Sequence, residues 1–68
     1  MNRAPKNSRA YNPTTFEGRL DAEERAAEFQ EQEEIHGGNL EFQTELHNET
    51  GGWAVIATLD GEFYSYTE

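Results

Sequence analysis

Carboxylates are the side chains with functional chemistry that recur at regular spacing in this chain. Glu24, Glu28 and Glu31 follow one another at intervals of four and three residues, and Glu17 and Glu34 continue close to the same line. On a helix such side chains lie about 5–6 Å apart along one face. Like charges at this spacing destabilise a helix by ~0.2–0.5 kcal/mol per pair. We therefore interpret the row as a negative field directed at a basic partner.

The chain offers little for catalysis or metal binding. It contains no cysteine, and His36 and His47 lack the spacing of a zinc site. Serine and threonine occur without the Gly-x-Ser-x-Gly setting of a nucleophile, and the two Gly-Gly pairs indicate a helix end and a turn rather than a phosphate loop. The sequence therefore predicts a protein that is not an enzyme and that binds no cofactor and no metal.

The charge is unevenly distributed along the 68 residues. Residues 1–15 contain three bases and no acid, whereas residues 16–68 contain all fourteen acids and two bases, a net charge of −12. A body this acidic repels nucleic acid and anionic membranes and attracts basic proteins. We expect a protein partner with a basic surface, and neither direct nucleic-acid binding nor membrane binding. The alternative is that the acidity serves solubility alone.

A helix is predicted over residues 22–36, which are mostly strong helix formers. Asp21, followed three residues later by Glu24, is typical of a helix start, and Gly37-Gly38 is typical of a helix end. The apolar stripe is narrow and consists of Ala22, Ala26 and Phe29. Such a helix can pack on a sheet but buries little surface.

Three strands are predicted over residues 39–47, 52–59 and 62–67, where apolar and polar residues alternate. Asp60-Gly61 between the last two favours a type I′ hairpin turn. The expected pairs are Leu40 with Leu59, Phe42 with Ala57, Thr44 with Val55, Leu46 with Trp53, Leu59 with Glu62, Ala57 with Tyr64, and Val55 with Tyr66. All these residues except Glu62 then share one apolar face, which the helix covers.

The expected fold is α+β, with one α-helix packed on a three-stranded antiparallel β-meander in the order α-β-β-β. Residues 16–68 form a single small domain, and residues 1–15 form a disordered, flexible basic tail. No apolar run reaches the length of a membrane span, and no signal-peptide pattern is present. We therefore expect a cytoplasmic location, in the host cytoplasm if the protein is phage-encoded.

One helix covers only one face of a sheet, so the opposite face is expected to expose Ile56 and Phe63 beside acids. An apolar spot rimmed by carboxylates suits a partner surface or a homodimer. The predicted partner-binding residues are the helical acids Glu24, Glu28, Glu31, Glu33 and Glu34 and the anchors Ile56, Phe63, Tyr64 and Tyr66. Two exposed apolar residues are also ordinary for any protein surface.

The functional hypothesis is a small acidic binding protein, an inhibitor or nucleic-acid-mimicking decoy that acts on a basic surface of a nucleic-acid-handling complex. In size, acidity and lack of a catalytic constellation the chain resembles, in character, the phage-encoded inhibitors of host defence or transcription complexes, and no motif assigns it to a named family. The alternative is a structural or assembly module that homodimerises or pairs through its β-sheet, for example by adding residues 62–67 to another chain.

Overall fold

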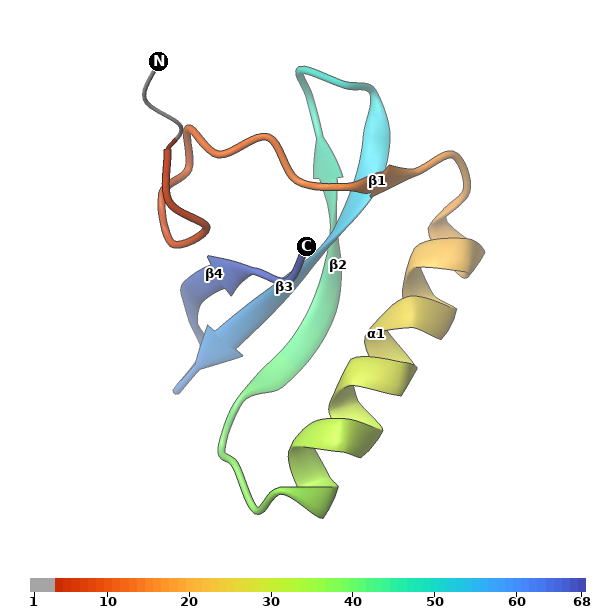
Figure 1. The fold of residues 1–68 in the computed structure, drawn as a ribbon. Coiled ribbons are helices and arrows are strands. Elements are labelled where there is room, and N and C mark those ends of the chain that lie inside the picture. The colour runs from red at the N-terminus through yellow and green to blue at the C-terminus, as the bar shows by residue number, and fades with distance from the viewer. Residues whose placement is uncertain (1–3) are drawn as a thin grey trace.

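The computed structural model describes residues 4–68 and contains there one helix and one four-stranded antiparallel sheet (Figure 1). The elements are β1 (Thr15–Phe16), α1 (Arg19–Ile35), β2 (Glu41–His47), β3 (Gly52–Leu59) and β4 (Glu62–Tyr66). The helix packs on one face of the sheet, so the predicted α+β class is confirmed. The unpredicted strand is β1, whose two residues are too few to form an alternating pattern.

The helix begins earlier than the predicted residue 22. Gly18 is the N-cap, with extended backbone at φ −110° and no side-chain cap, and Arg19 is the first helical residue. Asp21 therefore lies within the first turn, where its charge complements the positive end of the helix dipole. The prediction of Asp21 as the cap is wrong, because β1 ends at Phe16 and only Glu17 and Gly18 connect it to α1.

The end of α1 follows the predicted Gly-Gly signal. Gly37 has φ +71° and donates its N–H to the carbonyl of Glu34 at 3.1 Å. Gly38 donates its N–H to the carbonyl of Glu33 at 2.9 Å. These two bonds form a Schellman motif, which satisfies carbonyls that the helix itself leaves free.

The central strand of the sheet is β3. It pairs with β2 on one side and, on the other, with both β1 and β4, which follow one another along it. The predicted β2–β3 register is confirmed by the pairs Phe42 with Ala57, Thr44 with Val55, and Leu46 with Trp53. The ladder begins at the pair of Glu41 and Thr58, so the expected pair of Leu40 and Leu59 lies beyond it.

The β3–β4 hairpin has the predicted turn. Asp60 and Gly61 both have positive φ, 53° and 82°, as a type I′ turn requires. Leu59 pairs with Glu62, as expected. The signal for this turn depends only on two adjacent residues, and the structure confirms the turn that they predict.

Beyond the turn, a β-bulge changes the register. Ser65, not Tyr64, pairs with Ala57, and Tyr66 pairs with Ile56. Tyr64 is the extra residue, so the expected pairs of Tyr64 with Ala57 and Tyr66 with Val55 are wrong. Because side chains alternate between faces, this one-residue shift moves Tyr66 to the face that points away from α1.

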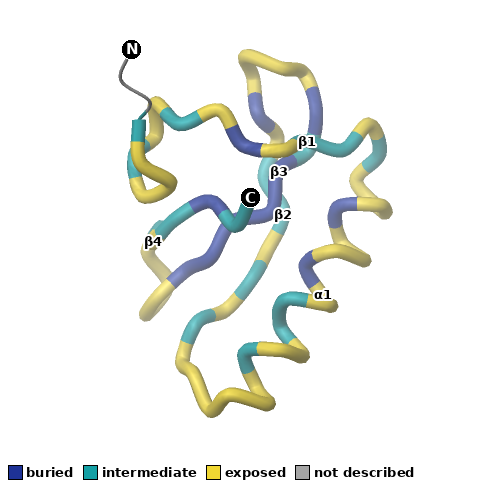
Figure 2. Tube along the Cα trace, in the orientation of Figure 1, coloured by how far each residue is buried: buried dark blue, intermediate teal, exposed yellow. Residues whose placement is uncertain are grey.

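The sheet has an apolar cluster on each face, and Figure 2 shows the buried residues gathered along β3. The cluster beneath α1 consists of Ala22, Ala26 and Val55, with Phe16, Phe29, Phe42 and Trp53 packed around it. The cluster on the opposite face consists of Ala54, Ile56 and Tyr66, with Tyr11 and Phe63 packed against it.

The N-terminal segment, residues 4–14, packs against this second cluster. The Tyr11 ring stacks on Tyr66 with 5.9 Å between centroids, and the carbonyl of Lys6 accepts the N–H of Tyr66 at 2.8 Å. Arg9 forms an ion pair with Glu45, and its guanidinium lies 3.9 Å from the centroid of the Phe63 ring. The expectation of a flexible tail over residues 1–15 is therefore wrong for residues 4–14 and for Thr15, which belongs to β1. Its part on residues 1–3 lies outside the described residues.

Candidate functional site

The outward side of α1 presents a group of exposed acidic side chains. Ala22 and Ala26 are buried against the sheet, so residues about half a turn away point to solvent. Glu24, Glu31 and Glu34 lie there, are exposed, and form no ion pair with any described residue. Three of the carboxylates predicted to face a partner are therefore available to one.

Two large apolar side chains stand at the ends of the same side. Leu20 is 75% exposed and Ile35 is 66% exposed, the two highest values among the exposed large hydrophobic residues of the range 4–68. They are fifteen positions apart along the helix, which corresponds to about 22 Å. We call the surface formed by Leu20, Glu24, Glu31, Glu34 and Ile35 the α1 face.

A shallow hollow of about 340 Å³ adjoins the α1 face on the side of β1. It is lined by Phe16, Asp21, Glu24, Arg25 and Glu28. β1 supplies the aromatic ring, and the first three turns of α1 supply the charges. Asp21 and Glu24 form no ion pair with any described residue, so these two carboxylates and the aromatic wall suit a cationic side chain, which gains both charge pairing and contact with the ring.

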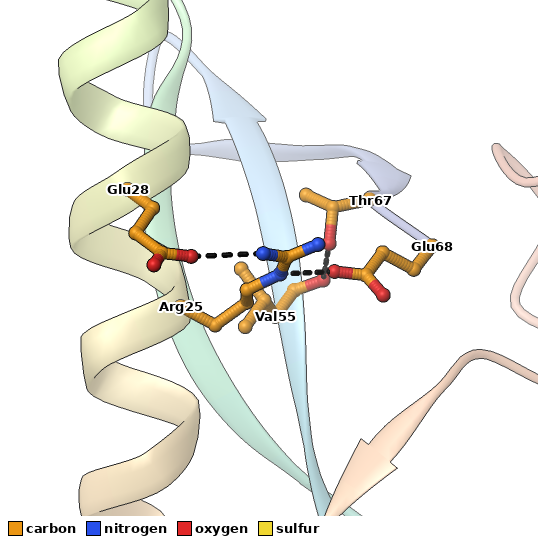
Figure 3. A network of polar contacts seen from close by, with 5 residues as sticks. All are labelled: Arg25, Glu28, Val55, Thr67 and Glu68. Atoms are coloured by element: carbon orange, nitrogen blue, oxygen red, sulfur yellow. Dashed lines mark hydrogen bonds and ion pairs between the residues drawn. The ribbon is translucent and has the colours of Figure 1, made fainter.

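Arg25 is held inside a polar network at this hollow (Figure 3). Its guanidinium donates to the carboxylates of Glu68 and Glu28, and these bonds raise the pKa of Arg25 above its usual value. Nearby, Thr67 donates both its N–H and its hydroxyl to the carbonyl of Val55. The network links α1 to the residues after β4, and it partly neutralises Glu28, one of the predicted partner residues.

Glu33, another predicted partner residue, has a different neighbour. Its carboxylate accepts the backbone N–H of Leu40 at 2.9 Å. It also lies over Gly38, where an added Cβ would come within 1.9 Å of Glu33 Oε2. Glu33 therefore connects the end of α1 to the start of β2.

The predicted apolar anchors are mostly enclosed. Ile56 and Tyr66 are 4% and 3% exposed, and Phe63 is half-buried beneath the N-terminal segment. The prediction that Ile56 and Phe63 are exposed is wrong, because residues 4–14 cover that face. Only Tyr64, 51% exposed at the bulge, remains accessible, and it lies on β4 rather than on α1.

Sequence reasoning missed Leu20, Phe16 and Ile35 as parts of this surface. Leu20 precedes the helix predicted over residues 22–36. Ile35 lies outside the predicted apolar stripe of Ala22, Ala26 and Phe29, and that position is the signal that it faces solvent. Phe16 gave no signal, because its position beside α1 depends on the pairing of β1 with Trp53 and Ala54.

Other types of site lack support in the described part of the chain. Within residues 4–68, no three His, Asp or Glu side chains come together as metal ligands would. No helix in that range has the length and apolar character needed to cross a bilayer. His47 is buried, with Nδ1 3.2 Å from the Thr50 hydroxyl and its ring against Tyr66, as in an ordinary core contact.

Comparison of the chain with known protein families, characterised proteins and solved structures finds no match.

Proposed function

We propose that this chain is a small non-enzymatic binding protein whose α1 face occupies a basic surface of a nucleic-acid-handling protein, as an inhibitor or nucleic-acid-mimicking decoy. The observation that carries the proposal is the combination of unpaired Glu24, Glu31 and Glu34 with exposed Leu20 and Ile35 on one face of a helix. A basic surface that binds phosphates offers lysine and arginine side chains, which form charge-assisted hydrogen bonds with carboxylates as well. The expected setting is a cytoplasm.

The acidic and apolar residues have separate roles in this proposal. The carboxylates attract a basic partner and speed the encounter, whereas charge at an exposed rim adds little affinity by itself. Leu20 and Ile35 provide apolar area that a partner can desolvate, which is where binding energy concentrates. The hollow beside Phe16 accepts one lysine or arginine of the partner and fixes the register.

The alternative, assembly through the sheet, receives less support. The sheet face opposite α1 is covered by residues 4–14, so a dimer through this face would first displace Tyr11 and Arg9 from Tyr66, Phe63 and Glu45. The outer edge of β4 is partly occupied, because the Tyr66 N–H already donates to Lys6. Tyr64 lies in a bulge, which interrupts regular pairing along that edge.

The test is affinity capture from a lysate of a plausible host at low and high salt, comparing native protein with a Glu24→Lys/Glu31→Lys/Glu34→Lys variant. These three acids are chosen because they have no ion pair in the described chain, so their replacement leaves the fold's polar contacts in place. The matched control is made at equal net charge: Glu49→Lys/Glu62→Lys, at exposed acids away from both α1 and β2, is compared with Glu24→Lys/Glu31→Lys.

We expect native protein and the control to capture the same nucleic-acid-binding protein at low salt, and the α1 variant to lose it. A Leu20→Ser/Ile35→Ser variant should weaken capture as well, without changing any charge. Three outcomes contradict the proposal. They are equal capture by all variants, equal loss by the α1 variant and its control, and the absence of any captured nucleic-acid-binding protein.

A further inference from the structure

The outer side of β2 presents backbone groups that no strand pairs. Residues of a strand point their N–H and C=O groups alternately to either side. The N–H of Thr67 donates to the carbonyl of Val55, so Val55 points its backbone groups away from β2. Its partner Thr44 therefore points its own groups outward, and Phe42 and Leu46 do the same.

Side chains of α1 satisfy one end of this outer side. Gln30 donates from Nε2 to the Leu40 carbonyl at 3.2 Å and accepts the Phe42 N–H on Oε1 at 3.0 Å, as a neighbouring strand would. Farther along, within residues 4–68, no hydrogen bond reaches the outward groups of Thr44 and Leu46 or the carbonyl of Phe42. We call these open groups the β2 edge.

A groove of about 360 Å³ runs along the β2 edge, between β2 and α1. Its α1 wall includes Ala26 and Ala27, whose small side chains leave room for another chain, and its β2 wall includes Phe42 and Thr44. Leu46, next along the strand, is 49% exposed. An extended segment that paired with the β2 edge would therefore place alternate side chains over these apolar atoms.

The charges beside the groove identify the chemistry of the occupant. Glu41 and Glu45 project from the other face of β2, and Glu23, which forms an ion pair with Arg19, lines the groove from α1. Arg9 already forms an ion pair with Glu45, so this row binds cations within the protein itself. A second copy of the chain would bring a further net charge of −9.

We propose that the β2 edge is a binding site for an extended basic segment of another protein, which adds antiparallel to β2. Its apolar side chains lie in the groove against Ala26 and Ala27, and its alternate lysines or arginines lie opposite Gln43 and Glu45. The site is separate from the α1 face, and either can fail without the other.

The test uses the full chain and an acetylated, amidated probe peptide of sequence Lys-Val-Lys-Val-Lys. Binding is followed by amide chemical shifts and by hydrogen exchange of the Thr44 and Leu46 N–H groups. In the antiparallel arrangement the valine amides face β2 and the lysine amides face solvent. We expect N-methylation of the valines to weaken binding about tenfold or more, and N-methylation of the lysines, at equal charge, to have little effect.

Variants of the protein provide a second measurement. Thr44→Pro removes an outward N–H that β3 does not use, and Thr44→Val retains it, so only the proline variant should lose the probe. Three outcomes overturn the proposal. They are equal weakening of binding by both kinds of N-methylation, chemical-shift changes confined to the acids of the α1 face, and no binding of the peptide. Protection of Thr44 and Leu46 that rises with protein concentration alone would show that a second copy occupies the edge, and would overturn it too.

Discussion

At the scale of single residues, polar side chains of α1 replace a missing strand. Gln30 and Glu33 together bind the outward groups of Leu40 and Phe42, where β2 begins. In sequence they are members of a polar run and look like solvent-facing residues. Their role depends on the angle at which α1 crosses the edge of β2, which no local pattern encodes.

Gln30→Ala should therefore lower the free energy of unfolding by about 1–2 kcal/mol, because two hydrogen bonds to backbone groups of β2 are lost. The matched control is Gln32→Ala, which removes the same side chain from an exposed position of the same helix and should change stability by less than about 0.5 kcal/mol. Urea denaturation of both variants measures the difference. Equal effects would mean that the Gln30 bonds contribute nothing to stability.

At the scale of elements, the bulge in β4 decides what each face of the sheet buries. With the bulge, Phe63 and Tyr66 both contribute to the cluster on the face away from α1, although they are three residues apart. A regular strand would place two such residues on opposite faces. The extra residue, Tyr64, is exposed and belongs to neither apolar cluster.

Deletion of Tyr64 should therefore be tolerated, because it removes the bulge and leaves Ser65 opposite Ala57 and Tyr66 opposite Ile56. Deletion of both Tyr64 and Ser65 should instead place Tyr66 opposite Ala57, beneath α1, and cost about 2 kcal/mol or more through loss of its buried position. Denaturation curves and the nuclear Overhauser contacts between Tyr66 and Tyr11 measure both effects. A single deletion as damaging as the double one would show that the bulge itself is required.

At the scale of the whole molecule, the N-terminal segment completes the second core. The Tyr66 hydroxyl and the Glu45 carboxylate raise the pKa of Arg9, whose guanidinium, like that of any arginine, is charged at ordinary pH. The basic segment thus lies on a body of opposite charge, with Tyr11 as its aromatic contact. A sheet of this size with only one covered face would expose Ile56 and Tyr66 to water.

Tyr11→Ala should lower the free energy of unfolding by about 1–2 kcal/mol, since it removes the ring stacked on Tyr66. Tyr64→Ala, at the exposed bulge position, is the matched control and should have an effect of less than about 0.5 kcal/mol. Thermal unfolding monitored by tryptophan fluorescence compares the two. If Tyr11→Ala is as mild as its control, residues 4–14 do not stabilise the sheet.

The sequence alone determined the features that follow local rules. Asp60-Gly61 predicts the hairpin turn and Gly37-Gly38 predicts the end of α1, because each feature depends on the backbone preferences of a few adjacent residues. Alternation predicts the register of β2 on β3, because side chains of a strand change face with a period of two. The acidity of α1 is also read directly from the sequence, and so are the carboxylates of the candidate site.

Only the tertiary structure decided which face Tyr66 occupies, what covers Ile56, and which acids of α1 remain unpaired. Each depends on contacts between residues far apart in the chain, such as Tyr11 with Tyr66, Arg9 with Glu45, and Arg25 with Glu68. Composition made residues 1–15 look like a tail because their few apolar atoms cannot form a core by themselves. Residues 4–14 pack because β3 and β4 already provide a core, so the stabilisation comes from contacts that neither segment makes alone.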